Sequence, residues 1–343
     1  MDIGVTLPTH GVMTRDGDGD CVLRNVPAVE MRPVERAIRA EQLGFHSIWL
    51  SDHIVTETTT TEAHPANSSG KRAYPDHPVM LDVATTLGAI ASRTERIRFS
   101  PSVYISPYRH PLITAHEFAT LDVLSGGRAI LAVGVGWEVG EFEALGAHYD
   151  RRGGVLNECI RIYRKAWTEP VIDFDGEFFQ IHSVSMDVKP VQGTLPIWYG
   201  GMSRIAAQRA ARLCDGFYPM FLDAVTTPQN LEPLREVLLR EGESIGRDLS
   251  DFVLGGFCQL RVCDEDEIRE RFPKGRPLLT GSVSQIVEDL TTFSRYGYSH
   301  VTAQLDCPSG SLSEYDDQME ALAPVVAEAR GITTTLERPV SAS

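Results

Sequence analysis

The sequence predicts an α/β protein whose parallel strands close into a (β/α)8 TIM barrel. Short apolar runs alternate with amphipathic segments of helical period along almost the whole chain, and the alternation repeats eight times. A doubly wound open sheet is the rival fold, but it normally needs fewer units. The 343 residues suffice for one large α/β domain, which we place at residues 1–332, followed by a flexible tail at 333–343.

Each predicted strand is a short apolar run that leads into a helical segment. The strands are expected at residues 2–8, 46–52, 96–103, 129–135, 195–201, 216–221, 252–262 and 300–306. The helices are expected near residues 27–44, 78–94, 109–124, 156–167, 206–213, 227–246, 282–296 and 319–329. The helix near 156–167 has one of the clearest patterns, because its apolar residues recur at spacings of three and four.

Three insertions interrupt the alternation, after strands 2, 4 and 7 of the predicted barrel. Residues 55–77 and 263–281 are long polar stretches that each follow a strand, so we expect both to project over the carboxyl ends of the strands. Residues 171–181 read VIDFDGEFFQI, which predicts a hairpin that turns at Asp175-Gly176.

Composition limits the partners and the compartment. The net charge of −15 argues against nucleic acid or an anionic membrane as the main partner. No apolar run approaches the length of a membrane span, and the first residues, MDIGVTLPTH, lack the basic and apolar regions of a signal peptide. The six cysteines are scattered without metal-ligand spacing, which is typical of reduced thiols. We expect a cytoplasmic protein that acts on a small molecule.

The second and fourth predicted strands end in residues that favour a functional site, because the carboxyl ends of barrel strands carry active sites. Asp52-His53 can place an imidazole near a substrate, although the same pair also occurs as a turn cap beside a surface histidine. The fourth strand ends in AVGVGW, residues 132–137. This is not a dinucleotide fingerprint, because Val139 stands where the third glycine is required.

The fifth predicted strand ends at Gly200-Gly201, and Ser203 can cap the helix that follows. The N-terminus of such a helix attracts a phosphate, although any tight strand-to-helix loop uses the same residues.

Metal and nucleophile motifs are missing from the sequence. No H-x-H follows the first strand, His116-Glu117 lacks the second histidine of H-E-x-x-H, and no G-x-S-x-G elbow occurs. We therefore expect no metal, and we assign the chemistry to an organic cofactor.

The strand-end residues resemble those of the luciferase-like family of flavin and deazaflavin oxidoreductases. The agreement runs over residues 2–222, in the order LGFHSIWLSDHIV, RIRFSPSVYISPYRHPLITAHEFATLDVLSGGRAILAVGVGWEVGEFEALG, RGGVLNECIRIYRKAW and KPVQGTLPIWYGGMSRIAAQRAARLCDGF. The last third of the chain agrees only in the order of strands and helices. The resemblance implies a luciferase-like TIM barrel and a homodimer, the common assembly of the family.

The resemblance also implies roles for individual residues. His53 would lie near the reactive edge of the cofactor ring as a proton donor or acceptor, with Asp52 as the second catalytic residue. A bulge with a non-prolyl cis peptide bond would lie against the face of the ring, here at Ser102-Val103. The implied cofactor-binding residues are Leu7, Pro8, Ser102, Val103, Tyr104, Gly134, Gly136, Trp137, Gly200, Gly201, Met202 and Ser203.

The forms Ser-Asp-His, residues 51–53, and AVGVGW, residues 132–137, look more similar to the branch that uses coenzyme F420 than to the branch that uses FMN and oxygen. The resemblance thus implies an F420-dependent oxidoreductase that transfers a hydride between the deazaflavin and a small organic substrate, namely a carbonyl, enone, imine or alcohol. One alternative is an FMN-dependent monooxygenase that uses O2 and reduced flavin, and another is a non-catalytic flavin-binding protein.

Two further sets of residues are candidates for ligand contacts. The substrate would be lined by Tyr104, Tyr108, His10 and Phe221. The acidic tail of the coenzyme would be met by basic residues near the rim of the barrel, with Lys71, Arg72, Arg151 and Arg152 as candidates by position.

Overall fold

Eight parallel strands form a barrel in the computed structural model, which describes residues 1–16, 20–58, 67, 69–71, 73–221, 227–334 and 336. The strands are β1 (Asp2–Thr6), β4 (Ser47–Leu50), β5 (Arg98–Pro101) with β6 (Tyr104–Ile105), β7 (Leu131–Gly134), β10 (Ile197–Gly200), β11 (Gly216–Tyr218) with β12 (Met220–Phe221), β13 (Val253–Val262) and β15 (His300–Leu305). The predicted barrel is confirmed, and each predicted strand is found at its place in the chain.

The barrel closes at its third strand, which is split into β5 and β6. On one side β5 pairs with β4, and on the other β6 pairs with β7, both in parallel register. A parallel bridge between Phe99 and Ala129, two residues before β7, completes the circle. Residues 102–103 separate the two segments, and the Ser102–Val103 peptide bond is cis, as the family resemblance implied.

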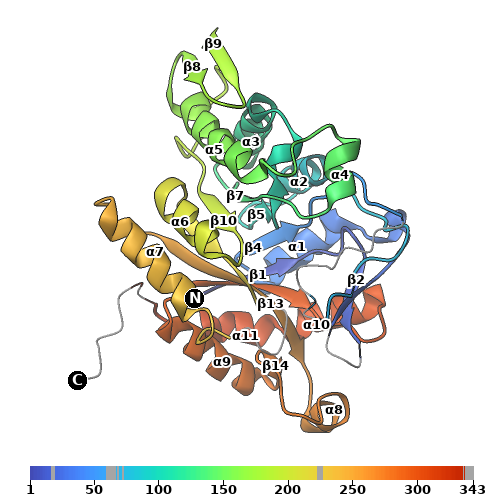
Figure 1. Ribbon diagram of the computed structural model, residues 1–343. Helices are drawn as coiled ribbons and strands as arrows, with labels where there is room; N and C mark the ends of the chain where they lie inside the picture. Colours follow the sequence, from blue (N-terminus) through green and yellow to red (C-terminus); the bar gives the residue numbers. More distant parts are fainter. Residues whose placement is uncertain are drawn as a thin grey trace, which may run out of the picture.

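Helices surround the strands, as Figure 1 shows. They are α1 (Pro33–Leu43), α2 (Val83–Ala91), α3 (Pro111–Ser125), α4 (Val139–Ala144), α5 (Arg152–Thr168), α6 (Arg204–Leu213), α7 (Glu232–Ser244), α8 (Glu265–Arg271), α9 (Val283–Arg295), α10 (Leu312–Ala321) and α11 (Ala323–Ala329), with 3-10 turns η1 (Ala28–Glu30) and η2 (Ser106–Tyr108). Among the described residues, none of these helices combines the length and the apolar character that crossing a membrane requires.

Large aromatic side chains fill the inside of the barrel. The Trp49 ring stacks on Tyr218 with their centroids 4.8 Å apart, and it lies 5.3 Å from the Trp198 ring. All three residues are buried. The barrel is therefore a packed core over much of its length.

Arg128 holds together the segments at which the barrel closes. Its buried guanidinium donates hydrogen bonds to the carbonyl oxygens of Ala91, Thr94, Ile97 and Ser125 at 2.7–2.9 Å. It also donates to the Thr94 hydroxyl at 2.8 Å. One side chain thus ties together the carboxyl-terminal ends of α2 and α3 and the start of β5.

The predicted insertions are present. The hairpin consists of β8 (Ile172–Asp175) and β9 (Gln180–Val184) and projects from one end of the molecule, while α8 projects at the other (Figure 1). Residues 263–281, expected as a loop, contain α8 and the short strand β14 (Thr280–Gly281). Much of the 55–77 insertion, including 59–66, lies outside the described residues. Of the tail, only residues 333, 334 and 336 are described, so its expected flexibility stays a prediction.

One further insertion was not predicted. An antiparallel hairpin, β2 (Val12–Arg15) and β3 (Cys21–Arg24), follows β1 and lies at the carboxyl end of the barrel. The sequence between its strands, DGDGD at residues 16–20, carries the Asp-Gly signal of a hairpin, but the flanking strands are too short to show a clear alternation of apolar and polar residues.

Candidate active site

A cavity of about 310 Å³ opens at the carboxyl ends of the strands. Its walls are mainly apolar, and a few polar side chains point into it, which is the usual composition of a small-molecule site. Ten of the fourteen residues predicted for the site line this cavity: Asp52, His53, Ser102, Val103, Gly134, Gly136, Trp137, Gly200, Gly201 and Met202.

The other four predicted residues lie around the cavity without lining it. Leu7 and Pro8 are buried. The Tyr104 ring packs edge-on against Phe118, outside the barrel, and its hydroxyl donates to Glu117 at 3.2 Å. Ser203 caps α6, as the sequence predicted. The reason for the Tyr104 difference is the break after residue 103, which turns this side chain toward α3.

His53 is held by carboxylates on α4 and on the residue before it. Its Nδ1 lies 2.7 Å from Glu141 Oε2 and 3.8 Å from Glu138 Oε2, and the His53 side chain is only 7% exposed. Burial alone would lower the pKa of His53. The hydrogen bond to Glu141 and the negative charges of Glu141, Asp52 and Glu138 outweigh burial and raise that pKa above its ordinary value.

Glu141 is itself fixed by several donors. The backbone N–H of Ile54 donates to its Oε1 at 2.7 Å, and the Tyr108 hydroxyl donates to its Oε2 at 2.7 Å. Burial tends to raise the pKa of Glu141, but His53 and these donors lower it below its ordinary value. Because an ionised Glu141 accepts at Nδ1, the Nε2 atom of His53 is the one left to face the cavity, where Tyr74 Oη lies 3.4 Å away.

Asp52 forms a buried ion pair with Arg109. Both carboxylate oxygens accept from the guanidinium at 2.8 Å, and Oδ2 also accepts from the backbone N–H of Ile105 at 2.8 Å. These contacts join the end of β4 to the strand segment that follows the cis peptide bond. With both oxygens engaged, Asp52 is placed to position the neighbouring residues, and we regard it as a positioning residue.

Buried polar atoms at the cavity without a hydrogen-bond partner among the described residues include His10 Nδ1 and Gln304 Oε1. The other His10 nitrogen, Nε2, lies 3.3 Å from the Ser51 hydroxyl. Burial, together with the charge of His53, lowers the pKa of His10 to about 4, so this ring is neutral at physiological pH. Buried polar atoms are normally paired, so these two atoms indicate a polar ligand in the cavity.

Val103 explains two of the predicted glycines. A Cβ on Gly134 would lie 2.3 Å from Val103 Cγ2, and a Cβ on Gly200 would lie 2.7 Å from Val103 Cγ1. Both distances are far below van der Waals contact. The glycines at the ends of β7 and β10 therefore make room for Val103, and a ligand would meet the valine between them.

The N-terminus of α6 borders the cavity beside Gly200 and Gly201. Ser203 Oγ accepts from the backbone N–H of Ala206 at 3.1 Å and caps the helix. The positive end of the helix dipole and the exposed Arg204 that begins the helix suit an anion.

The four basic residues that were candidates to contact the acidic tail of the coenzyme have different surroundings. Lys71 lies 3.2 Å from Asp16, and Arg151 pairs with Glu177. The Arg152 guanidinium stacks 3.9 Å from the centroid of the Tyr149 ring. Arg72, and the side chain of Phe221 expected at the substrate, lie outside the described residues.

Sequence reasoning missed the residues that hold the site together, Glu138, Glu141, Arg109 and Tyr74. They lie on α4, before it, and in connecting segments, so no strand-end rule selects them. His53, Glu138 and Glu141 lie close enough to hold a metal ion. The short His53–Glu141 contact and the donors already bound to Glu141 favour a hydrogen-bonded histidine instead.

The chain is similar to proteins of known families. Residues 1–330 match the sequence model of the luciferase-like monooxygenase family. An F420-dependent glucose-6-phosphate dehydrogenase of Amycolatopsis mediterranei (strain U-32) is 31% identical over 188 residues, which cover 54% of this chain and 51% of that enzyme. The chain thus spans about half the length of this curated relative.

Solved structures share the fold along almost the entire chain. An F420-dependent secondary alcohol dehydrogenase, in complex with an F420-acetone adduct, has a TM-score of 0.69 at 19% identity, covering 96% of this chain and 99% of that one. The oxygenating constituent of 3,6-diketocamphane monooxygenase from Pseudomonas putida, in complex with FMN, also has a TM-score of 0.69, at 16% identity, covering 98% and 99%. At these identities the likeness shows the barrel and does not distinguish the cofactors.

Proposed function

Because the chain belongs to the luciferase-like monooxygenase family, we propose that it is an oxidoreductase that uses coenzyme F420 and a small organic substrate. The observation that carries the proposal is His53, buried at an apolar cavity and held by Glu141 at 2.7 Å. A histidine fixed at one nitrogen and facing the cavity with the other suits proton transfer. The similarity to F420-dependent glucose-6-phosphate dehydrogenases supports the deazaflavin as the cofactor.

The residues that line the cavity fit a flat ring with polar edges. Val103 and the glycines at 134 and 200 form an apolar wall, and Trp137 lines the same cavity. His10 Nδ1 and Gln304 Oε1 are buried without partners among the described residues, so they suit the donors and acceptors at the edge of such a ring. The N-terminus of α6 would receive the phosphate of the coenzyme.

The coenzyme, when bound, would supply or accept the hydride. His53 Nε2 would exchange the proton that accompanies it, giving a proton to the substrate oxygen or nitrogen during reduction and taking one during oxidation. Glu141 would keep the imidazole ring of His53 in one orientation and stabilise its protonated form. Asp52 would hold the segment around Val103 by accepting a hydrogen bond from Ile105. The methionines and aromatic residues of the cavity, among them Met13, Met220 and Phe257, favour a partly apolar substrate.

Equilibrium binding tests the cofactor. We expect F420 to bind with a micromolar or lower Kd in a fluorescence titration, and FMN to bind at least tenfold more weakly. The reverse preference would favour the alternative, an oxygen-using flavin monooxygenase, and would call for oxygen-consumption assays. Binding of neither cofactor would contradict the whole assignment of the site.

Replacement of His53 tests its role separately from binding. His53→Gln should keep the Kd for F420 within a few-fold and lower kcat by about 10²–10⁴-fold in the reduction of carbonyl or enone substrates by reduced F420. His77→Gln, an exposed histidine beyond Tyr74 in the same connecting segment, is the matched control and should change neither quantity. If His53→Gln retained full turnover, a different proton donor would have to take the place of His53 in this mechanism.

A further inference from the structure

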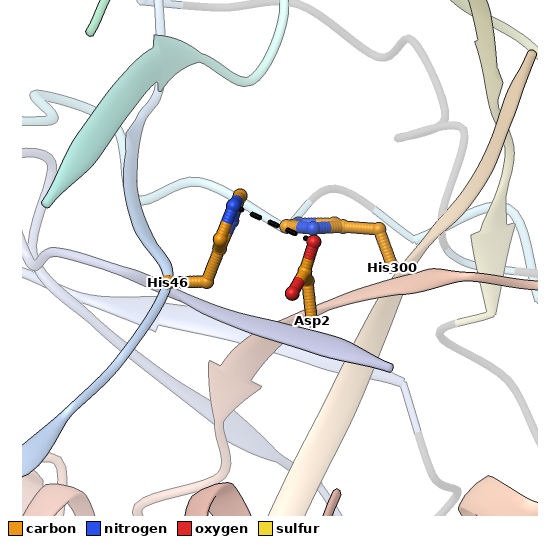
Figure 2. Close-up of side chains that lie close together, drawn as sticks. All are labelled: Asp2, His46 and His300. Atoms are coloured by element: carbon orange, nitrogen blue, oxygen red, sulfur yellow. Dashed lines mark ion pairs between the residues drawn. The ribbon is translucent and has the colours of Figure 1, made fainter. Parts of the chain in front are cut away.

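Two histidines and a carboxylate meet at the amino-terminal end of the barrel, the end opposite the cavity. Asp2 is the first residue of β1, His300 is the first residue of β15, and His46 directly precedes β4. Figure 2 shows the three side chains converging on one point. We propose that Asp2, His46 and His300 form a binding site for a divalent transition metal, with Zn²⁺ as the best match to the ligand set.

The strand order brings these distant residues together. β1 lies between β4 and β15, and Asp2 is directly opposite His300 in the parallel register. The backbone N–H of His46 donates to the carbonyl of Ile3 at 2.8 Å, which fixes His46 beside the start of β1. The three positions thus rest on hydrogen-bonded strands, and the backbone holds them in place without a metal.

The distances suit a tetrahedral ion. Zn²⁺ bonds of about 2.0–2.1 Å separate neighbouring ligand atoms by about 3.3 Å. His46 Nε2 lies 3.4 Å from Asp2 Oδ2. One ligand atom from each of the three residues lies within 4.8 Å of the others, and the two rings meet edge to face with centroids 5.7 Å apart. Small side-chain rotations would bring the three ligand atoms to the tetrahedral spacing of about 3.3 Å.

An unpartnered buried nitrogen is independent support for a ligand here. His300 is 2% exposed, and its Nδ1 has no hydrogen-bond partner among the described residues. Its Nε2 lies 3.1 Å from the Thr302 hydroxyl. When Nε2 carries the proton and donates it to Thr302, the lone pair of Nδ1 is available to a metal. A ligating histidine typically donates its other N–H to a neighbouring oxygen in this way.

A cavity beside the cluster provides an entry path and a fourth ligand. It has a volume of about 350 Å³ and is lined by Asp2 and His46, and also by Arg96, Arg98 and Arg330. The protein supplies three ligands, so a water, a hydroxide or another small anion would complete the tetrahedron. The neighbouring arginines favour an anion at that fourth position.

Imidazole nitrogens with one carboxylate are ligands that Zn²⁺ accepts, whereas Mg²⁺ and Ca²⁺ prefer sets of oxygen atoms. A bound ion would link β1, β4 and β15, and so join residues from both ends of the chain. We therefore expect the site to stabilise the fold and to leave the chemistry at the other end of the barrel unchanged.

The test is a zinc titration of the chelator-treated, tag-free chain in competition with a chromophoric chelator. We expect one equivalent of Zn²⁺ to bind with a micromolar or lower Kd and to raise Tm. Co²⁺ in its place should give the visible absorption of a tetrahedral site. Asp2→Asn and His46→Gln should each weaken Zn²⁺ binding at least tenfold and remove the rise in Tm.

The second cluster of potential ligands provides the control. Glu141→Gln alters the His53 cluster and should leave the affinity for Zn²⁺ within twofold of the unchanged chain. The Asp2 side chain is 56% exposed, so Asp2→Asn keeps the fold even if His46→Gln does not. Binding that resists Asp2→Asn, binding abolished by Glu141→Gln, or a Kd above about 1 mM would overturn the proposal.

Discussion

His53 and Glu141 are the residues on which the chemistry of the cavity depends. Glu141→Gln keeps the size of the side chain and removes its charge, so the pKa of His53 should fall, because burial then acts with less opposition. NMR titration of the histidine rings measures this pKa, and the pH profile of kcat should move to lower pH with it. Glu143→Gln, an exposed change on the same helix, should move neither. An unchanged profile in Glu141→Gln would show that Glu141 does not set the state of His53.

The same pair should also give a bell-shaped dependence of stability on pH. The raised pKa of His53 contributes stability that is fully present below 6.5 and is lost as the pH rises through the higher folded value. The lowered pKa of Glu141 contributes stability that is present above 4.5 and is lost as the pH falls through the lower folded value. Urea unfolding should therefore show the largest difference between the unchanged chain and Glu141→Gln between pH 4.5 and 6.5.

Gly134 is a residue where one methyl group should matter. In Gly134→Ala the new Cβ would lie 2.3 Å from Val103 Cγ2, inside a packed wall, so we expect a loss of about 1–3 kcal/mol in the free energy of unfolding. Gly88→Ala, inside α2, is the control. Its Cβ would lie in ordinary van der Waals contact with Leu121 at 3.8 Å, and alanine favours a helix, so the change should raise the free energy of unfolding by up to about 1 kcal/mol. Chemical denaturation measures both. Equal stability of Gly134→Ala and the unchanged chain would mean that Val103 moves aside freely.

At the scale of the element, two capped helices separate a structural role from a binding role. Ser203 caps α6 at the cavity, and Ser282 caps α9 through a capping box. Ser203→Ala and Ser282→Ala should each cost about 0.5–2 kcal/mol of stability, because each removes the acceptor for a backbone N–H of the first turn. Only Ser203→Ala should also weaken F420 binding, by about three- to tenfold. Equal Kd values for both variants would place the phosphate elsewhere.

The sequence predicted the strands better than the helices and connections. Runs such as 129–135 are apolar and rich in β-branched residues because they are buried inside a ring of helices, so their place in the chain is visible without a structure. The strands of the hairpin β2–β3 are too short to show a clear alternation, and the helix α8 has Ile268 as its one apolar residue, so neither pattern was distinguished from a loop. Asp52 and His53 were found because the strand-end rule selects them. Glu141 and Arg109 reach the site through tertiary packing, which leaves no local pattern.

At the scale of the whole molecule, the closure of the barrel depends on Arg128. Arg128→Lys replaces a planar group that satisfies five oxygens with a single ammonium that cannot reach them all, so buried carbonyls lose their donors. We expect a loss of about 3 kcal/mol or more in the free energy of unfolding, measured in guanidinium chloride. Arg93→Lys, an exposed change at the end of α2, should cost less than about 0.5 kcal/mol. Similar losses in both variants would remove Arg128 from this role.

The contact of Val103 with the glycines at 134 and 200 also limits how this barrel can evolve. The Val103 side chain occupies the space into which a side chain at residue 134 or 200 would project. A larger side chain at either glycine is therefore tolerated only where residue 103 has become smaller. Across relatives, the three positions should therefore change together, with glycine kept at 134 and 200 wherever a branched residue occupies 103. The identity of residue 103 would then determine how much of the cavity wall each lineage can vary.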